Sequence, residues 1–337
     1  MVTKANYQQP KPPFSWGRWL QALWAFSRPH TIVGTTLSVG ALGVMALVLT
    51  GPESLSARPP EELLGRLSAL IFAMVAALIP SLCANVYIVG LNQLTDIAID
   101  RINKPQLPLA SGAFSVLMGR WIVAVLGGLA LALAAVQGSI LWGTVALSMA
   151  IGTVYSLPPL RLKRFPFWAA LCIFGVRGVI VNLGFFAHFR QGLGSKSAFR
   201  APWQAIPPEV WALTVFVVLF AFAIAIFKDI PDIEGDRRFQ VRTLTVRLGP
   251  RFGFRLSLGV LSLCYGLLIG LTLLGGLPSV QPLFIVVSHG GLLGLLWWKS
   301  GRVKLTDKAQ VAQFYQFIWR LFFLEYLLFP LACILAR

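Results

Sequence analysis

The strongest constraint on the fold is a series of apolar stretches, each close to the ~20 residues that an α-helix needs to cross a membrane. Nine can be read along the 337 residues, at 31–50, 67–91, 121–136, 140–157, 167–187, 210–227, 252–276, 281–298 and 314–335. The chain is 57% hydrophobic and 12% charged, which excludes disorder and does not suit a soluble domain. We therefore predict an all-α membrane protein with nine transmembrane helices. The division between the third and fourth helices depends on 137–139, Gln-Gly-Ser.

The basic residues indicate how these helices cross the membrane. With the amino terminus on the cytoplasmic side, 22 of the 29 Lys and Arg residues fall in cytoplasmic segments and six on the opposite side, and Arg177 lies within a span. This is the positive-inside distribution. It explains the net charge of +17 by membrane topology, so we expect no nucleic acid partner.

The residues before the first span have a different pattern. Between 14 and 26, Trp16, Trp19 and Trp24 alternate with polar residues at roughly helical spacing. This is typical of an amphipathic helix that lies on the membrane surface. We therefore divide the chain into a cytoplasmic segment, 1–27, with an interfacial helix, and one transmembrane domain, 28–337.

Two acidic segments follow the second and sixth spans and hold six of the 12 acidic residues. In each segment aspartates are four residues apart, so a continuing helix would stack them on one face. Solvated loop ends are the simpler explanation, but the repeated spacing favours a site for a hard cation such as Mg²⁺, shared with a phosphate group. The candidate ligands are Asn92, Asp96, Asp100, Asp229, Asp232 and Asp236.

The two segments are four spans apart and so emerge on the same face. A four-helix unit used twice, with a ninth helix added, would place them around a central cavity. Basic residues accompany them, namely Lys104 and Lys228, and the loop 155–164 brings Tyr155, Arg161 and Lys163 to the same face. This loop could anchor anionic lipid or bind a phosphate group.

Carboxylates and cations at the mouth of an apolar cavity suit a ligand with a diphosphate head and a hydrocarbon tail. If the tail is allylic, the metal and the cations stabilise the departing pyrophosphate, and an electron-rich aromatic ring attacks the allyl cation that remains. A transporter is the alternative, since acids within membranes also mark ion pathways. Acids at the cytoplasmic ends of helices favour the enzyme.

Asn92-x3-Asp96-x3-Asp100 and Asp232-x3-Asp236 resemble the two aspartate motifs of the UbiA-type intramembrane aromatic prenyltransferases. The resemblance covers nearly the whole chain. It implies that these five residues, with Asp229, hold Mg²⁺ and the diphosphate, that Asp96, Asp100, Asp232 and Asp236 are catalytic, and that Tyr155 and Lys163 bind substrate. The spacing of Tyr155 and Lys163 is wider than in some relatives, which leaves Arg161 as the alternative phosphate contact.

Within this family, residues 92–112 and 227–236 are similar to the members that transfer a phytyl group to homogentisate. This implies phytyl diphosphate as donor, homogentisate as acceptor with loss of CO₂, and 2-methyl-6-phytyl-1,4-benzoquinol as a product on the route to tocopherol. It also implies a thylakoid or plasma membrane of a photosynthetic bacterium. Chlorophyllide, 4-hydroxybenzoate and a naphthoate remain alternative acceptors.

Arg177 is the basic residue placed within a span, about ten residues into the fifth. An arginine there must face the bundle interior and find an anion or carbonyl groups. We expect no acidic residue elsewhere in the spans at a comparable depth. Its partner is then either structural, such as backbone carbonyls or Asn182, or the carboxylate of the acceptor.

Overall fold

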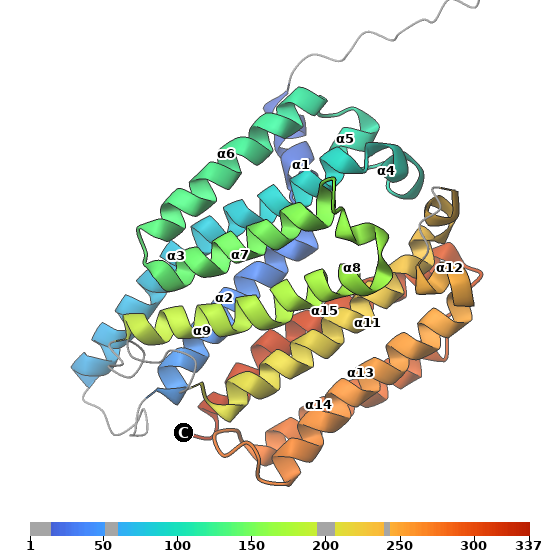
Figure 1. Ribbon diagram of the computed structural model, residues 1–337. Coiled ribbons are helices and arrows are strands. Elements are labelled where there is room, and N and C mark those ends of the chain that lie inside the picture. The colour runs from blue at the N-terminus through green and yellow to red at the C-terminus, as the bar shows by residue number, and fades with distance from the viewer. Residues whose placement is uncertain (1–14, 51–59, 194–205, 239–242) are drawn as a thin grey trace, which may run out of the picture.

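The computed structural model describes residues 15–50, 60–193, 206–238 and 243–337. Over these residues the chain is helical, without a β-strand (Figure 1). Nine of the described helices are long and apolar enough to cross a membrane, which confirms the predicted number of spans. They comprise α2 (Pro29–Leu49), α3 (Pro60–Thr95), α6 (Val116–Ala135), α7 (Ser139–Ser156), α8, η3 and α9 in series (Pro166–Phe174, Gly175–Ile180 and Val181–Gly192), α11 (Pro208–Arg238), α13 (Pro250–Leu273), α14 (Pro282–Ser300) and α15 (Lys308–Ile334).

Shorter helices connect the long ones. They are α1 (Trp16–Phe26), α4 (Ile97–Asn103), α5 (Pro108–Ser111), η2 (Leu162–Arg164) and α12 (Leu244–Leu248). Figure 1 shows α4, α5 and α12 at one end of the bundle, with the carboxyl terminus at the other end. The candidate acidic and basic segments therefore come together at one end of the long helices.

Helix α1 forms where the tryptophan pattern predicts it. Trp16, Leu20 and Trp24, spaced by four, are all exposed, whereas Phe26 is fully buried. The Trp19 and Phe26 rings pack against Phe114 beyond α5, so one face of the helix is attached to the bundle. The exposed apolar face suits a membrane surface, and this location of α1 stays a prediction.

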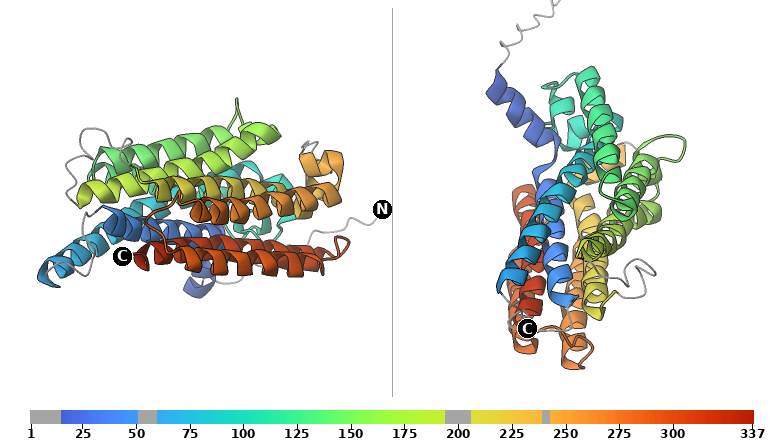
Figure 2. Two further views of the ribbon diagram at one scale, coloured as in Figure 1. Left: turned by 90° about the horizontal axis from the view of Figure 1, so that it is seen from below. Right: turned by 90° about the vertical axis from the view of Figure 1, so that its left-hand side faces the viewer.

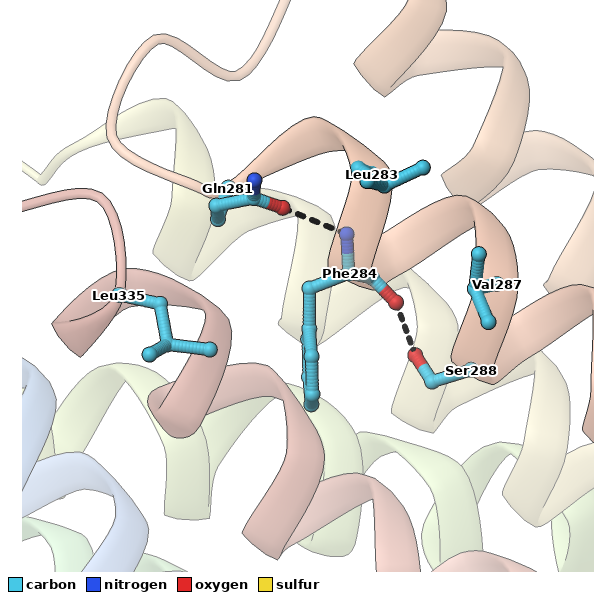
Figure 3. A pocket seen from close by; sticks show the side chains of 6 residues that line it. All are labelled: Gln281, Leu283, Phe284, Val287, Ser288 and Leu335. Carbon is cyan, nitrogen blue, oxygen red and sulfur yellow. Dashed lines mark hydrogen bonds between the residues drawn. The ribbon is translucent and has the colours of Figure 1, made fainter.

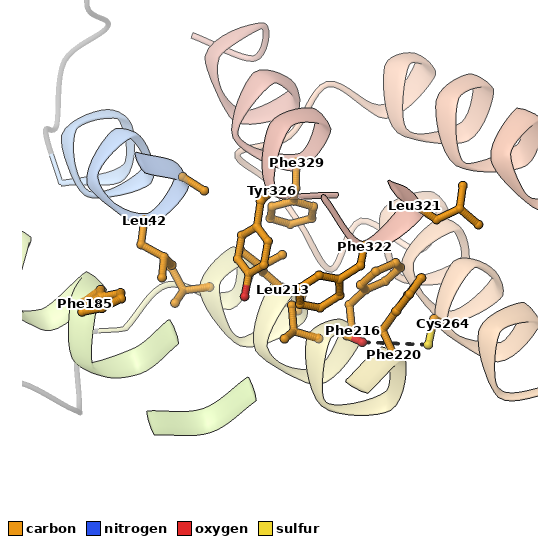
Figure 4. Close-up of a cluster of buried hydrophobic side chains, with 14 of the residues drawn as sticks. Leu42, Phe185, Leu213, Phe216, Phe220, Cys264, Leu321, Phe322, Tyr326 and Phe329 are labelled. Atoms are coloured by element: carbon orange, nitrogen blue, oxygen red, sulfur yellow. Dashed lines mark hydrogen bonds between the residues drawn. The ribbon is translucent and has the colours of Figure 1, made fainter. Parts of the chain in front are cut away.

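Two helices organise the bundle. Helix α2 contacts α3, α9 and α15, while α11 contacts α13, α15 and η3. In the left view of Figure 2, α15 (red) and α7 (green) lie on opposite sides of the bundle. Aromatic side chains from α11, α13 and α15 fill the core around Phe216, Phe220 and Phe322 (Figure 4).

Small residues let the helices approach closely. A Cβ atom at Gly184 would lie 2.2 Å from Thr144 Oγ1 on α7, and one at Gly178 would lie 2.4 Å from Val218 on α11. Contacts of this kind replace the hydrophobic driving force, which is weak between helices surrounded by lipid. They fix the fifth span, which carries Arg177, between α7 and α11.

Two interruptions depart from regular helices. The fifth span contains a π-helical turn, η3, between α8 and α9. The second span ends at Thr95, and α4 begins at Ile97, so the condition for stacking Asn92, Asp96 and Asp100 on one face, a continuing helix, is not met. Asp96 has φ −118° and ψ 16°, outside the helical region, although the Asp100 amide still donates to the Asp96 carbonyl at 2.8 Å.

Candidate functional site

A cavity of about 1510 Å³ lies inside the bundle and is lined by both acidic segments. Asp96 and Asp100 reach it from the end of α3 and from α4, and Asp229 and Asp232 reach it from α11. Apolar side chains of α8 and α11 line another part of it. The cavity therefore combines a charged region with an apolar one, as the sequence predicts for a diphosphate with a hydrocarbon tail.

Asp96 is held by the basic loop between α7 and α8. Its Oδ1 atom lies 2.7 Å from Lys163 Nζ and 3.1 Å from Arg161 Nη2. The same two side chains donate to Thr95, Lys163 to the hydroxyl at 2.7 Å and Arg161 to the carbonyl at 3.0 Å. The break after Thr95 leaves its carbonyl free to accept from Arg161, because a regular helix would bond this carbonyl internally.

Arg161 and Lys163, the two candidate contacts for a phosphate group, thus both lie beside Asp96, and the structure does not choose between them. Burial lowers the pKa of Lys163 below its ordinary value, while the charge of Asp96 acts in the opposite direction. An anion that replaces Asp96 as the partner would meet two cations already fixed by Thr95.

Asp100 is 5% exposed, and its Oδ2 atom is buried without a hydrogen-bond partner in the described structure. Burial raises the pKa of this carboxyl, against the positive charges of Arg28 and Lys104. A buried carboxylate oxygen without a partner is costly. Asp100 is therefore suited to bind an added cation.

The second acidic segment is joined to the first by Lys104. Its Nζ atom lies 2.7 Å from Asp232 Oδ2, a contact between the segment after α4 and helix α11. On α11, Lys228 Nζ lies 3.6 Å from Asp229 Oδ1. Asp236 continues α11 one turn beyond Asp232, but its side chain lies outside the described residues.

The donor set fits Mg²⁺ when a phosphate completes it. No three acidic, His or Cys side chains among the described residues form a metal-binding group by themselves. Mg²⁺ commonly uses one or two carboxylates together with substrate phosphates. Asp96, Asp100 and Asp232 supply hard oxygen atoms on one cavity, and the free Oδ2 of Asp100 has the chemistry of a ligand.

Asn92 on α3 and Tyr155 on α7 also line the cavity, as do the other candidate site residues whose side chains are described. The structure thus brings together residues separated by more than 130 positions. Their individual roles stay predictions.

Sequence reasoning missed several cavity residues. Arg28, His30 and Trp319 line the cavity from the start of α2 and from α15, and Arg247 lines it from α12. The sequence 28–30, Arg-Pro-His, at the entrance to the first span is a signal that could have indicated the first two. Trp319 and Arg247 could not be assigned, because only the packing of α15 and α12 directs them to the cavity.

The environment of Arg177 corrects two expectations. Glu325 lies within α15 and is fully buried, so the prediction of no other acid at depth in the spans is wrong. Glu325 pairs with His289, also fully buried, at 3.1 Å between Oε2 and Nε2. The Asn182 side-chain oxygen accepts a hydrogen bond from the Tyr326 hydroxyl at 2.9 Å, so it is the partner of Tyr326 and not of Arg177.

A smaller hollow of about 530 Å³ lies at the start of α14 (Figure 3). It is lined by Gln281, Leu283, Phe284, Val287, Ser288 and Leu335. None of these carries a charge, and Gln281 and Ser288 are engaged in hydrogen bonds within α14, which leaves little for chemistry. The larger cavity is the candidate active site.

Fold and cavity define a multi-pass membrane protein with opposed acidic segments beside a basic loop. A family model described as the UbiA prenyltransferase family matches residues 36–321. The chain belongs to this family, and is a prenyltransferase by membership. The resemblance to this family is therefore confirmed, and the roles of the two aspartate motifs stay predictions.

Curated relatives extend the similarity over most of the chain. A homogentisate phytyltransferase of Synechocystis sp. is 51% identical over 316 residues, covering 93% of this chain and 96% of that protein. Homogentisate phytyltransferase 1 of Arabidopsis thaliana is 39% identical, over 92% of this chain and 75% of that protein.

Solved structures share the fold. A UbiA homologue from Archaeoglobus fulgidus bound to GPP and Mg²⁺ has a TM-score of 0.57 at 17% identity, covering 92% of this chain and 99% of that one. A UbiA homologue from Aeropyrum pernix has a TM-score of 0.63 at 20% identity, covering 89% and 97%.

Proposed function

We propose that this protein transfers a phytyl group from phytyl diphosphate to homogentisate, with loss of CO₂, to give 2-methyl-6-phytyl-1,4-benzoquinol for tocopherol synthesis. The observation that carries the proposal is the meeting of both acidic segments on one cavity, where Lys104 contacts Asp232 across the two segments. The apolar part of the same cavity suits the hydrocarbon tail.

The donor and acceptor are assigned from the relatives. The Synechocystis protein, 51% identical, is named for phytyl transfer to homogentisate. A wheat relative named homogentisate geranylgeranyltransferase is 38% identical, as is an Arabidopsis homogentisate solanesyltransferase. Homogentisate is thus common to these names, while the prenyl chain differs, so the acceptor assignment has the broader support.

We assign Mg²⁺ as the metal, held by Asp96, Asp100 and Asp232, with Asn92, Asp229 and Asp236 contributing. When bound, it neutralises charge on the diphosphate as pyrophosphate departs. Lys163, Arg161, Lys104 and Lys228 bind the phosphate oxygens, and Tyr155 lies among them on the cavity wall. The Archaeoglobus homologue, which is bound to GPP and Mg²⁺ together, supports this pairing of metal and donor.

The charged end of the cavity faces the cytoplasm in our proposal. The basic residues concentrate in the segments that flank it, as the positive-inside rule requires. A donor that lies in the bilayer would then present its diphosphate at the cytoplasmic surface, with its tail between the helices.

The test is product analysis by mass spectrometry with protein purified in detergent. Homogentisate, 4-hydroxybenzoate and chlorophyllide are each offered with phytyl and geranylgeranyl diphosphate, with Mg²⁺ or with excess EDTA. We expect methylphytylbenzoquinol from homogentisate and phytyl diphosphate, and none with EDTA. Product from another acceptor, with none from homogentisate, would overturn the assignment.

A further inference from the structure

An arginine inside the bundle faces the cavity without an anionic partner among the described residues. Arg177 lies ten residues after Phe167, the start of its span, which is ~15 Å at 1.5 Å per residue. It lines the cavity, and no hydrogen bond or salt bridge joins it to another described residue. A charge at this depth is costly unless it meets an anion.

The guanidinium is fixed by its surroundings. Its Cζ atom lies 5.7 Å from the ring centroid of Trp319 and 5.8 Å from that of Phe322, within the range of a cation–π interaction. On the α2 side it fills the space beside Gly34, where an added Cβ would lie 2.7 Å from Nη1. The π-helical turn positions this side chain, and glycine at position 34 gives it room.

Flat rings lie beside this cation. The His30 and Trp319 rings are 4.8 Å apart between centroids, and both line the cavity. The His30 ring makes no hydrogen bond with any residue that the structure describes, and its polar edge is available to a ligand. Together Arg177, His30 and Trp319 offer a cation, a polar edge and aromatic surfaces.

These groups match an aromatic acid. Homogentisate has a ring, two hydroxyl groups and a carboxylate on one carbon side arm. A guanidinium binds a carboxylate through a planar pair of hydrogen bonds. The diphosphate has its own cations, Lys163, Arg161 and Lys104, at the acidic segments.

We propose that Arg177 binds the carboxylate of the aromatic acceptor, whose ring lies against Trp319 and His30; this rests on the proposed function. The acceptor is thereby held by its side arm while the ring remains free to meet the prenyl carbon. Acceptors that have the same ring but no carboxylate are discriminated against at this position.

The first test is Arg177→Gln with steady-state kinetics. Loss of a charged hydrogen-bonded partner predicts a rise of about 10- to 100-fold in the KM for homogentisate, while the KM for prenyl diphosphate is unchanged. Methylhydroquinone, which has the ring without the carboxylate, should inhibit wild type and variant at the same concentration. Arg177→Lys retains part of the affinity, because charge remains without the planar fork.

Two glycine variants test the same contact with the arginine intact. Gly34→Ala places a methyl group against Nη1 and is expected to raise the KM for homogentisate several-fold. Gly40→Ala, on the same helix with nothing within 4 Å of its added Cβ, is the matched control and leaves the KM unchanged. This pair keeps the proposal testable if Arg177→Gln does not fold.

Equilibrium binding of radiolabelled homogentisate to purified protein gives a readout apart from turnover. Unchanged acceptor KM and unchanged binding in folded Arg177→Gln, or in Gly34→Ala, would overturn the carboxylate contact. A selective rise in the donor KM would also overturn it. Absence of any product from wild type with homogentisate would instead refute the proposed function, so the two failures are distinguishable.

Discussion

The contact between Lys104 and Asp232 joins the two acidic segments, and Lys104→Met removes it while keeping most of the side chain's volume. The Nζ–Oδ2 distance is 2.7 Å, and the side chains are 30% and 8% exposed. At an effective dielectric constant of ~20, the Coulomb energy at this distance is about 6 kcal/mol, before the cost of desolvation. Hydrogen bonds to charged groups contribute about 1.5–3 kcal/mol net. Because Lys104 is partly exposed, we expect the variant to lose free energy of unfolding near the lower end of this range.

The assay is thermal unfolding in detergent, without and with Mg²⁺. We expect the Tm of Lys104→Met to fall by a few degrees, because about 1.5 kcal/mol is lost and Tm responds by roughly 2–4 °C per kcal/mol in long chains. Adding Mg²⁺ should raise the Tm of the variant by more than it raises the Tm of wild type, since Mg²⁺ replaces the missing positive charge beside Asp232. The KM for prenyl diphosphate also rises.

A second lysine that pairs with α11, the helix of Asp232, offers a matched control. Lys308 pairs with Glu234 on α11 at 2.9 Å, but the two side chains are 87% and 72% exposed. Exposed pairs of this kind contribute little to stability. Lys308→Met should therefore leave Tm and KM unchanged. Equal Tm values for Lys104→Met and wild type, with equal donor KM, would refute the reasoning that Lys104 links the two segments.

Three further predictions address other parts of the chain. Asp96→Ala and Asp236→Ala should each lower turnover by at least about 100-fold in a folded, membrane-inserted protein, because a carboxylate that positions the metal is lost; near wild-type activity in saturating Mg²⁺ would exclude that residue as a ligand. Lys163→Ala should raise the KM for prenyl diphosphate more than that for homogentisate, and a selective effect on homogentisate would move Lys163 to the acceptor site. Glu325→Ala, which leaves His289 buried without its partner, should lower the free energy of unfolding by about 1–2 kcal/mol with both KM values unchanged; equal stability in chemical unfolding would contradict this.

The helical architecture could be predicted because hydropathy and charge are properties of the residues themselves. The nine apolar stretches correspond to nine membrane-length helices among the described residues. Gly138, with φ 113°, separates α6 from α7, as the sequence 137–139 predicts. The paired aspartates could be found for a similar reason, since their spacing and their place after apolar stretches are visible in the chain.

The remaining features depend on contacts between distant segments. The break at Asp96 accompanies its contacts with Arg161 and Lys163, which lie more than 60 residues away. Glu325 is visible within an apolar stretch, but its pairing with His289 depends on the packing of α14 against α15. Trp319 reaches the cavity only through the packing of α15 against α2 and α11.

The π-helical turn between α8 and α9 has a consequence for how this protein can change in evolution. A π turn contains one residue more than an α-helical path of the same shape. Deleting one residue within 175–180 would therefore restore a regular helix while α9 keeps its orientation, so that Gly184 still meets Thr144. The side chains within the turn would change direction, and Arg177 would no longer be held beside Gly34. A relative that lacks this residue should thus keep the arrangement of helices but lose the position of Arg177.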